Sequence, residues 1–246
     1  MNALFAAIRF LTILPLPGKR GNAECDLVSS LWFFPVVGIL VGTVVAVTSL
    51  GLAPFLPKGL NALLAVGLLL AVSGGLHLDG LADCADGFFS SRPRARILEI
   101  MRDSHVGVMG VVALFLVLGA KWVAIGELPL AQMGKALFLA PVAGRCSMVM
   151  MMAILPYARS EGGLATLFYS ARSRGPALWS AVVLICVSWA SGETGLWSIG
   201  AVLLTLLCFV VFCSRKIGGA TGDTLGACSE LAETAVLIGF SLSPPV

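Results

Sequence analysis

Long apolar segments recur along the whole chain and constrain its fold more than any other feature. About 20 apolar residues are enough to cross the hydrocarbon core of a bilayer as a helix. Segments close to this length lie near residues 28–50, 60–78, 107–126, 136–155, 177–192, 196–213 and 225–243. Only 12% of the 246 residues are charged, whereas a soluble domain carries about 25%. We therefore predict an all-α, polytopic membrane helix bundle with about six to seven transmembrane helices.

The two ends of the chain are less regular than its middle. About a dozen apolar residues open the chain, too few to span a bilayer, and they include Arg9, so we expect an interfacial helix there. The last apolar segment contains Glu230 and Glu233, and it could span, re-enter or lie at the interface. Because no repeat or polar linker divides the chain, we predict one membrane domain over residues 1–246. Its oligomeric state is left open.

The basic residues are distributed unevenly between the two sets of loops. If all seven segments span, eleven lysines and arginines lie in one set of loops, near residues 15–27, 87–106, 156–176 and 214–224. The opposite loops hold only Lys58 and Lys135. Positive charge marks the cytoplasmic side of a membrane protein. We therefore expect the polar loops, and any site that they form, to face the cytoplasm.

Three carboxylates follow the second apolar segment in "GGLHLDGLADCADGFF", residues 74–89. Asp79, Asp83 and Asp86 are spaced i, i+4 and i+7, so they share one face of a helix that continues this segment. Carboxylates crowded near a low-dielectric core take up protons unless a cation lies among them. Ligands that are all oxygen suit Mg²⁺. The alternative is a solvated helix end. We expect the small neighbours, Gly80 and Gly87, to leave this face open to a bulky ligand.

A second acidic stretch, "TGDTLGACSELAE", covers residues 221–233 and places Asp223 and Glu230 at i and i+7. The glycine-rich turn before it, with Gly219, Thr221 and Gly222, could offer backbone N–H groups to a phosphate. It could equally be a plain turn between helices.

The segment "RPRARILEIMRDSHVG", residues 92–107, combines four arginines with Asp103. Its arginines, Arg102 among them, could hold diphosphate oxygens while Asp103 adds a metal ligand, or the segment could lie on lipid headgroups. His77 could act as a base, orient a carboxylate or pack as a neutral imidazole.

Two further basic residues lie inside predicted spans. Arg145 needs an anionic partner, which could be an aspartate of the cluster, a substrate phosphate or a structural ion pair. Lys121 is expected to extend toward the interface without a function.

Acidic residues, arginines and a glycine-rich turn at one end of a bundle indicate metal-assisted phosphoryl transfer. The motif "DGLADCADG" is also similar to that of CDP-alcohol phosphotransferases, but it lacks their longer spacing to the final two acids. An ion-coupled transporter is a further alternative, although its acids usually lie at the midplane, often within inverted repeats. The nucleotide that is released, GMP or CMP, would distinguish a GDP-dependent transferase from a CDP-alcohol phosphotransferase.

Five segments together resemble the cobalamin synthase family of adenosylcobinamide-GDP ribazoletransferases, in order and in spacing. They are "RFLTILPLP", "GGLHLDGLADCADGFF", "IMRDSHVGVMG", "GRCSMVMMMAILPYAR" and "GGATGDTLGACSELAE". The resemblance runs from about residue 8 to residue 233, and "GGxHxDGLADxxDG" is its most specific part.

This resemblance implies a Mg²⁺-dependent enzyme of the inner (cell) membrane. Such an enzyme joins adenosylcobinamide-GDP to α-ribazole, or its 5′-phosphate, and releases GMP; no nucleic acid is expected as a partner. On this basis Mg²⁺ is expected on Asp79, Asp83 and Asp86, with Asp223 or Asp103 adding ligands. Arg102, Arg145 and Arg159 are expected to neutralise phosphate charge, and His77 or a metal-free carboxylate to take the hydroxyl proton.

Overall fold

The computed structural model describes residues 2–16, 23–159, 164–170 and 174–242, and all its regular elements there are helical. Tyr157 and Ala220 add one isolated parallel bridge. The all-α prediction is therefore confirmed. The helices are α1 (Asn2–Leu11), α2 (Ala23–Ser30), η1 (Leu31–Phe33), α3 (Phe34–Leu52), α4 (Lys58–Ser73), α5 (Leu76–Phe88), α6 (Arg94–Ile100), α7 (Val108–Glu127), α8 (Leu130–Ile154), α9 (Leu164–Ser170), α10 (Arg174–Ala190), α11 (Glu193–Ile217) and α12 (Gly222–Ser241).

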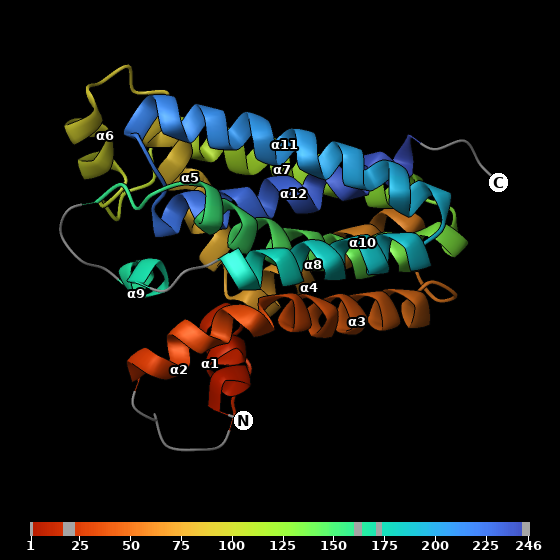
Figure 1. Ribbon diagram of the computed structural model, residues 1–246. Helices are drawn as coiled ribbons and strands as arrows, with labels where there is room; N and C mark the ends of the chain where they lie inside the picture. The colour runs from red at the N-terminus through yellow and green to blue at the C-terminus, as the bar shows by residue number, and fades with distance from the viewer. Residues whose placement is uncertain (1, 17–22, 160–163, 171–173, 243–246) are drawn as a thin grey trace.

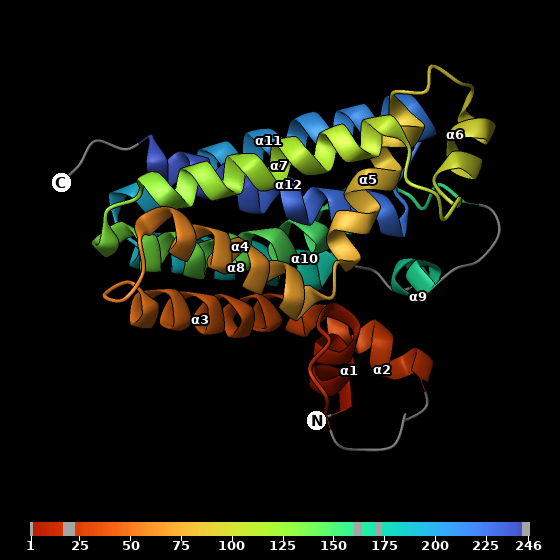
Figure 2. The ribbon, with the colours of Figure 1, turned by 180° about the vertical axis from the view of Figure 1, so that it is seen from behind.

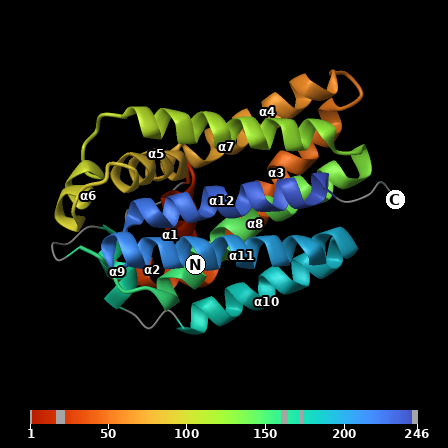
Figure 3. The same ribbon diagram turned by 90° about the horizontal axis from the view of Figure 1, so that it is seen from above.

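The long helices α3, α4, α7, α8, α10, α11 and α12 run along one common direction and form the bundle (Figure 1). The same arrangement is visible from behind and from above (Figures 2 and 3). Helix α12 packs against α5, α7, α8 and α11, so it is surrounded by other helices. Because most of the surface of α12 faces protein, its acidic side chains also face other helices.

Four helical segments are long and apolar enough to cross a membrane alone: Cys25–Leu52, α7, α8 and α11. A fifth crossing is reached if α4 and α5 are one bent span. The other two predicted spans are also helices of the bundle, but α10 has only 17 residues and α12 carries three acidic residues. Helix α12 is continuous from Gly222 to Ser241, which argues against a re-entrant segment. The polytopic membrane bundle is thus confirmed.

The second predicted span ends earlier than expected, at a pair of glycines. Gly74 and Gly75 both have positive φ, at 63° and 76°, a region that residues with a Cβ rarely adopt. The chain bends there by 93°, and α5 begins as a separate helix. The expectation that α5 continues the second span is therefore wrong. Helix α5 lies across the end of the bundle, outside the set of long helices that run in parallel, together with α1, α2, α6 and α9 (Figure 2).

The connections predicted to share one side all lie at this same end of the bundle (Figure 1). The links from α5 through α6 to α7, from α8 through α9 to α10, and from α11 to α12 meet there, with α1 and α2 beside them. Residues 17–22, 160–163 and 171–173 of these loops lie outside the described residues. The grouping is confirmed for the described parts of these loops, while Lys19, Arg20 and Arg172 lie outside the described residues and the interfacial position of α1 stays a prediction.

Candidate active site

The acidic helix α5 is held against the start of α12 by a close crossing of two backbones. A Cβ on Gly80 would lie 2.5 Å from the carbonyl oxygen of Asp223, and one on Gly226 would lie 3.1 Å from Cα of His77. Only glycine allows this approach. The crossing brings Asp79 and Asp83 to the side of Asp223. Gly87 is buried against Met101 and Ile97, so the expectation of an open face is wrong there, whereas Gly80 lines a cavity described below.

Asp83 lies at the centre of the resulting acidic cluster, which we define as Asp79, Asp83, Asp86 and Asp223. Burial and, in decreasing order, the carboxylates of Asp79, Asp223 and Asp86 raise the pKa of Asp83 to about 7, and Arg159 opposes this shift. Within the described part of the chain, no hydrogen bond or ion pair is formed by the side-chain carboxylate of Asp79 or Asp83. Asp83 is half-buried among like charges and therefore most needs a cation, and the exposed carboxylate of Asp79 beside it is available to the same ion.

Asp86 has a different role from the one its spacing suggests. Its two oxygens accept hydrogen bonds from the backbone N–H groups of Gly107, at 2.7 Å, and Gly110, at 2.9 Å. These amides lie at the start of α7, where the first N–H groups of a helix have no partner within the helix. Asp86 is thus a cap for α7 supplied by another helix. The aspartate spacing gave no sign of this contact, which joins residues more than twenty positions apart.

Asp223 is paired with a cation that comes from the segment after α8. Nη2 of Arg159 donates to Oδ2 of Asp223 at 2.7 Å, and both side chains are largely buried. The hydroxyl of Thr221 donates to the same oxygen at 3.3 Å. Because both contacts use Oδ2, the other oxygen, Oδ1, is available to a ligand.

The glycine-rich turn before α12 is a helix cap and not an open phosphate cradle. The N–H of Ala220 donates to Pro156, and the N–H of Thr221 donates to the hydroxyl of Thr224. The Thr221 hydroxyl in turn accepts from the N–H of Thr224. Gly219 packs against the carbonyl of Pro156, where no side chain would fit. The N–H and the hydroxyl of Thr221 are therefore already engaged, whereas the phosphate contact at Gly219 stays a prediction and Gly222 lines a cavity described below.

Asp103 lies apart from the acidic cluster and faces solvent. Its carboxylate bonds the Nδ1 of His105 at 2.6 Å, and this contact lowers the pKa of Asp103 and raises that of His105. The predicted metal ligand is thus occupied by an exposed imidazole. Arg102 is placed more favourably, because it lines a cavity of about 520 Å³ together with Arg94 and Arg159.

A second group of charged side chains lies inside the bundle and includes the anionic partner of Arg145. Its guanidinium pairs with Glu233, and Nζ of Lys121 lies 2.6 Å from both Glu230 and Glu233. None of these four side chains belongs to a residue more than 5% exposed. We call them the interior quartet. Lys121 does not extend to the interface as expected, and the partner of Arg145 is a glutamate and not a phosphate, so this pair is a structural one.

His77 is buried between these two charged groups. It is 1% exposed, and neither ring nitrogen has a hydrogen-bond partner among the described residues. Burial, then the nearby Arg145 cation, lowers the pKa of His77 to about 3, which makes it a poor general base. It lines a cavity of about 240 Å³, which we call the junction pocket, with side chains of α1, α5, α8, α9 and α12. Asp79, Arg159 and Asp223 also line this pocket.

No group of three or more His, Cys, Asp or Glu side chains within the described ranges is arranged to hold a metal ion alone. Mg²⁺, however, is commonly bound through one or two carboxylates together with waters and substrate phosphates. The unpaired Asp79 and Asp83 fit this requirement. Asp86 and Asp103 fit it less well, because their oxygens already accept hydrogen bonds.

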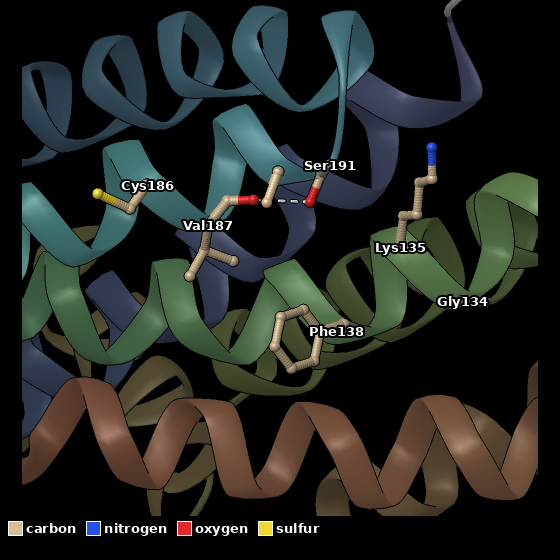
Figure 4. A pocket seen from close by; sticks show the side chains of 7 residues that line it. Gly134, Lys135, Phe138, Cys186, Val187 and Ser191 are labelled. Atoms are coloured by element: carbon tan, nitrogen blue, oxygen red, sulfur yellow. Dashed lines mark hydrogen bonds between the residues drawn. The ribbon is translucent and has the colours of Figure 1, made fainter.

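The cavity between α8 and α10 offers no comparable chemistry. It measures about 400 Å³ and is lined by Gly134, Lys135, Phe138, Cys186, Val187, Ala190 and Ser191. The Ser191 hydroxyl is already bonded to the carbonyl of Val187, at 2.8 Å (Figure 4). Lys135 is the single charged residue in its lining. The acidic cluster at the opposite end is therefore the candidate site.

Comparison with known proteins identifies the family to which the chain belongs. The chain is similar to adenosylcobinamide-GDP ribazoletransferases of Acetivibrio thermocellus, Desulforamulus reducens and Chlorobaculum tepidum. The identities are 37%, 40% and 42%, over 98%, 96% and 96% of this chain and 98%, 94% and 93% of the relatives. No solved structure matches. The family model described as cobalamin-5-phosphate synthase matches residues 3–241. The chain therefore belongs to the cobalamin-5-phosphate synthase family.

Proposed function

We propose that the protein joins adenosylcobinamide-GDP to ribazole, or its 5′-phosphate, and releases GMP, at the acidic cluster where α5 crosses α12. The observation that carries the proposal is Asp83, which lies among three other carboxylates, with Arg159 as the cation that opposes their effect. A protein does not keep such an arrangement for stability alone, because like charges repel at close range. Family membership supports the same reaction.

In this proposal Asp79 and Asp83 hold Mg²⁺ through their unpaired carboxylates. When bound, the ion supplies positive charge to the diphosphate and stabilises the leaving phosphate. Arg102 and Arg159 add further positive charge from the adjoining cavity, which Arg94 also lines. Arg159 also fixes Asp223 through the contact at 2.7 Å.

The new bond forms between a ribazole hydroxyl oxygen and the phosphorus attached to cobinamide. The bond between that phosphorus and the bridging oxygen breaks, and GMP leaves with this oxygen. The hydroxyl proton passes to Oδ1 of Asp223, which lines the junction pocket and is not used by Arg159 or Thr221. Asp223 is favoured over His77 because the buried imidazole binds a proton weakly.

The position of the cluster supports catalysis at the cytoplasmic face of the inner membrane. The cluster lies at the end of the bundle that carries the basic loops, including Arg94, Arg102 and Arg159 (Figure 1). Basic loops mark the cytoplasmic side.

The test is GMP release from purified membranes that contain the full-length protein. We expect release to require both adenosylcobinamide-GDP and α-ribazole, to need Mg²⁺ and to stop with EDTA. Asp83→Asn membranes are the matched control for background hydrolysis. If GMP release needs both substrates but continues in EDTA, the proposed transferase activity stands and the proposed need for Mg²⁺ is wrong. Absence of release from folded protein would contradict the proposal, and CDP-activated lipids would then be tried.

A further inference from the structure

The junction pocket is lined by flat and polarisable side chains that suit an aromatic ring. Phe10 and Phe168 contribute to its wall and pack edge to face, with ring centroids 5.2 Å apart. Tyr157, Met148 and Met152 line it from other elements. Aromatic rings and thioethers make favourable contacts with the faces and edges of planar ligands. The pocket therefore favours a flat, mostly apolar group.

His77 supplies the single neutral polar side chain of the lining that is fully buried. Its two ring nitrogens have no partner in the described part of the chain, so an N–H donor and an acceptor are both unused. Buried polar groups are nearly always hydrogen-bonded, and an unpaired one calls for an explanation. A planar ligand with one ring nitrogen that accepts a hydrogen bond would complete this site.

The size of the pocket limits what can enter. Its volume of about 240 Å³ lies below the range of about 300–1,000 Å³ that is usual for whole drug-sized ligands. A corrinoid is far too large, whereas a single bicyclic base fits. Guanine fits by size, but it has several donors and acceptors on its edges, and burying them without partners is costly. A benzimidazole has only one free ring nitrogen and otherwise apolar edges.

The pocket also joins the acidic cluster, because Asp79 and Asp223 line it together with the aromatic side chains. A nucleoside whose base occupies the apolar part would therefore place its sugar hydroxyls beside these carboxylates. This is the arrangement that transfer to a ribazole hydroxyl requires, since the reacting atoms must be held in contact before reaction.

We propose that the junction pocket binds the benzimidazole base of ribazole and that His77 donates a hydrogen bond to the free nitrogen of that base. This inference rests on the proposed function and extends it to the acceptor substrate. It makes His77 a residue that binds and selects substrate, and it leaves proton transfer to Asp223. The Phe10–Phe168 pair and the two methionines then hold the ring plane.

The test compares α-ribazole with an analogue in which the free ring nitrogen is replaced by C–H. The wild-type protein should bind α-ribazole about tenfold more tightly than the analogue, because the analogue leaves His77 unpaired. In His77→Leu this preference should disappear, while KM for adenosylcobinamide-GDP stays the same. Ser229→Ala is the matched control, since Ser229 is also buried and unpaired but does not line the pocket.

Binding is measured first by equilibrium dialysis of α-ribazole against full-length protein in nanodiscs, without the second substrate. This readout does not need turnover, so a failure of the proposed reaction and a failure of the pocket can be distinguished. If His77→Leu does not fold, Met152→Phe serves instead, because it fills the pocket and should raise the Kd for α-ribazole about tenfold. Equal wild-type affinity for ribazole and its analogue would overturn the proposal, as would a His77→Leu or Met152→Phe effect on adenosylcobinamide-GDP alone.

Discussion

The interior quartet and the acidic cluster are both groups of charged side chains, but they differ in balance. The quartet has two cations and two anions, and each charge lies in contact with an opposite one. The cluster has four carboxylates and one close cation, Arg159, which is bound to Asp223. The quartet lies in the middle of the bundle, whereas the cluster lies at its end.

This difference indicates which group is structural and which is functional. A buried charge costs several kcal/mol unless a partner neutralises it, so a balanced group can be kept inside a membrane bundle. An unbalanced group destabilises the fold, and it is kept where a ligand restores the balance. Arg145 and Asp83 illustrate the contrast, because sequence motifs alone gave both a place in phosphate chemistry. Each prediction below tests this division.

The largest effect is expected from Glu233→Leu in the quartet. The substitution leaves Lys121 paired with Glu230 but removes the carboxylate that Arg145 contacts, and it should destabilise the protein by about 3–5 kcal/mol. Thermal unfolding in detergent would measure the loss. The double variant Glu233→Leu with Arg145→Met keeps the contacting pair of Lys121 and Glu230, so it should recover much of the stability. An unfolding temperature that stays at the wild-type value in Glu233→Leu would show that the quartet is not structural.

The next effect is expected from Asp83→Asn in the cluster, and it should concern activity alone. Loss of a metal ligand removes several kcal/mol of transition-state stabilisation, which corresponds to about a 100-fold to 1,000-fold slower GMP release. Stability should stay the same or rise, because one of four crowded carboxylates becomes neutral. Both quantities are measured on one preparation. Full activity in this variant would remove the metal site at Asp83.

Lowering the pH should weaken Mg²⁺ binding at the acidic cluster, because a proton competes with the ion for the Asp83 carboxylate. Because the pKa of Asp83 without metal is raised to about 7, a proton occupies it below that pH and competes with Mg²⁺. The Mg²⁺ concentration for half-maximal activity should therefore rise about fivefold between pH 7 and pH 6, approach a tenfold rise per pH unit below pH 6, and level off above pH 8. For folding without metal, the raised pKa means that the native state holds the proton more tightly. Stability should fall as pH rises from about 4 to 7.

A smaller effect is expected from Asp86→Ala. Asp86 caps α7 through Gly107 and Gly110, and the loss of a helix cap costs about 0.5–2 kcal/mol. Denaturant titration would measure this loss. A fall in activity as large as that of Asp83→Asn, in protein that is fully folded, would show instead that Asp86 binds the metal.

The smallest effect is expected from Asp103→Asn. Asp103 is exposed and bonds only His105 among the described residues, so GMP release and its Mg²⁺ dependence should be unchanged. The pKa of His105 should fall toward its usual value, because the carboxylate that raises it becomes neutral. An NMR titration of His105 measures this shift. A changed Mg²⁺ requirement would mean that Asp103 reaches the metal after all.

Much of the architecture follows from local patterns in the sequence. Apolar length predicted the bundle helices, and the spacing of Asp79, Asp83 and Asp86 predicted a shared helix face. The basic loops predicted which ends of the helices come together. Each of these signals depends on neighbours within a few residues, such as the helical period or the length of a span.

The partners of the charged residues could not be predicted in this way. Lys121 reaches Glu230 and Glu233 across more than a hundred positions, and no local pattern specifies that pairing. The bend at Gly74 and Gly75 was missed because glycine is also frequent within membrane helices. The turn before α12 was over-interpreted at Ala220 and Thr221, since their N–H groups are used by Pro156 and Thr224. Tertiary contacts decide all three cases.

The balance of the interior quartet determines how a membrane voltage would act on the bundle. Lys121, Arg145, Glu230 and Glu233 sum to zero charge, so the transmembrane voltage exerts no net force on the quartet as a unit. A variant that removes one of the four leaves one elementary charge inside the bundle. Moving such a charge across the full field is worth about 2.3 kcal/mol per 100 mV. The wild-type bundle should therefore fold equally well in polarised and depolarised membranes, whereas a single-charge variant should become sensitive to voltage.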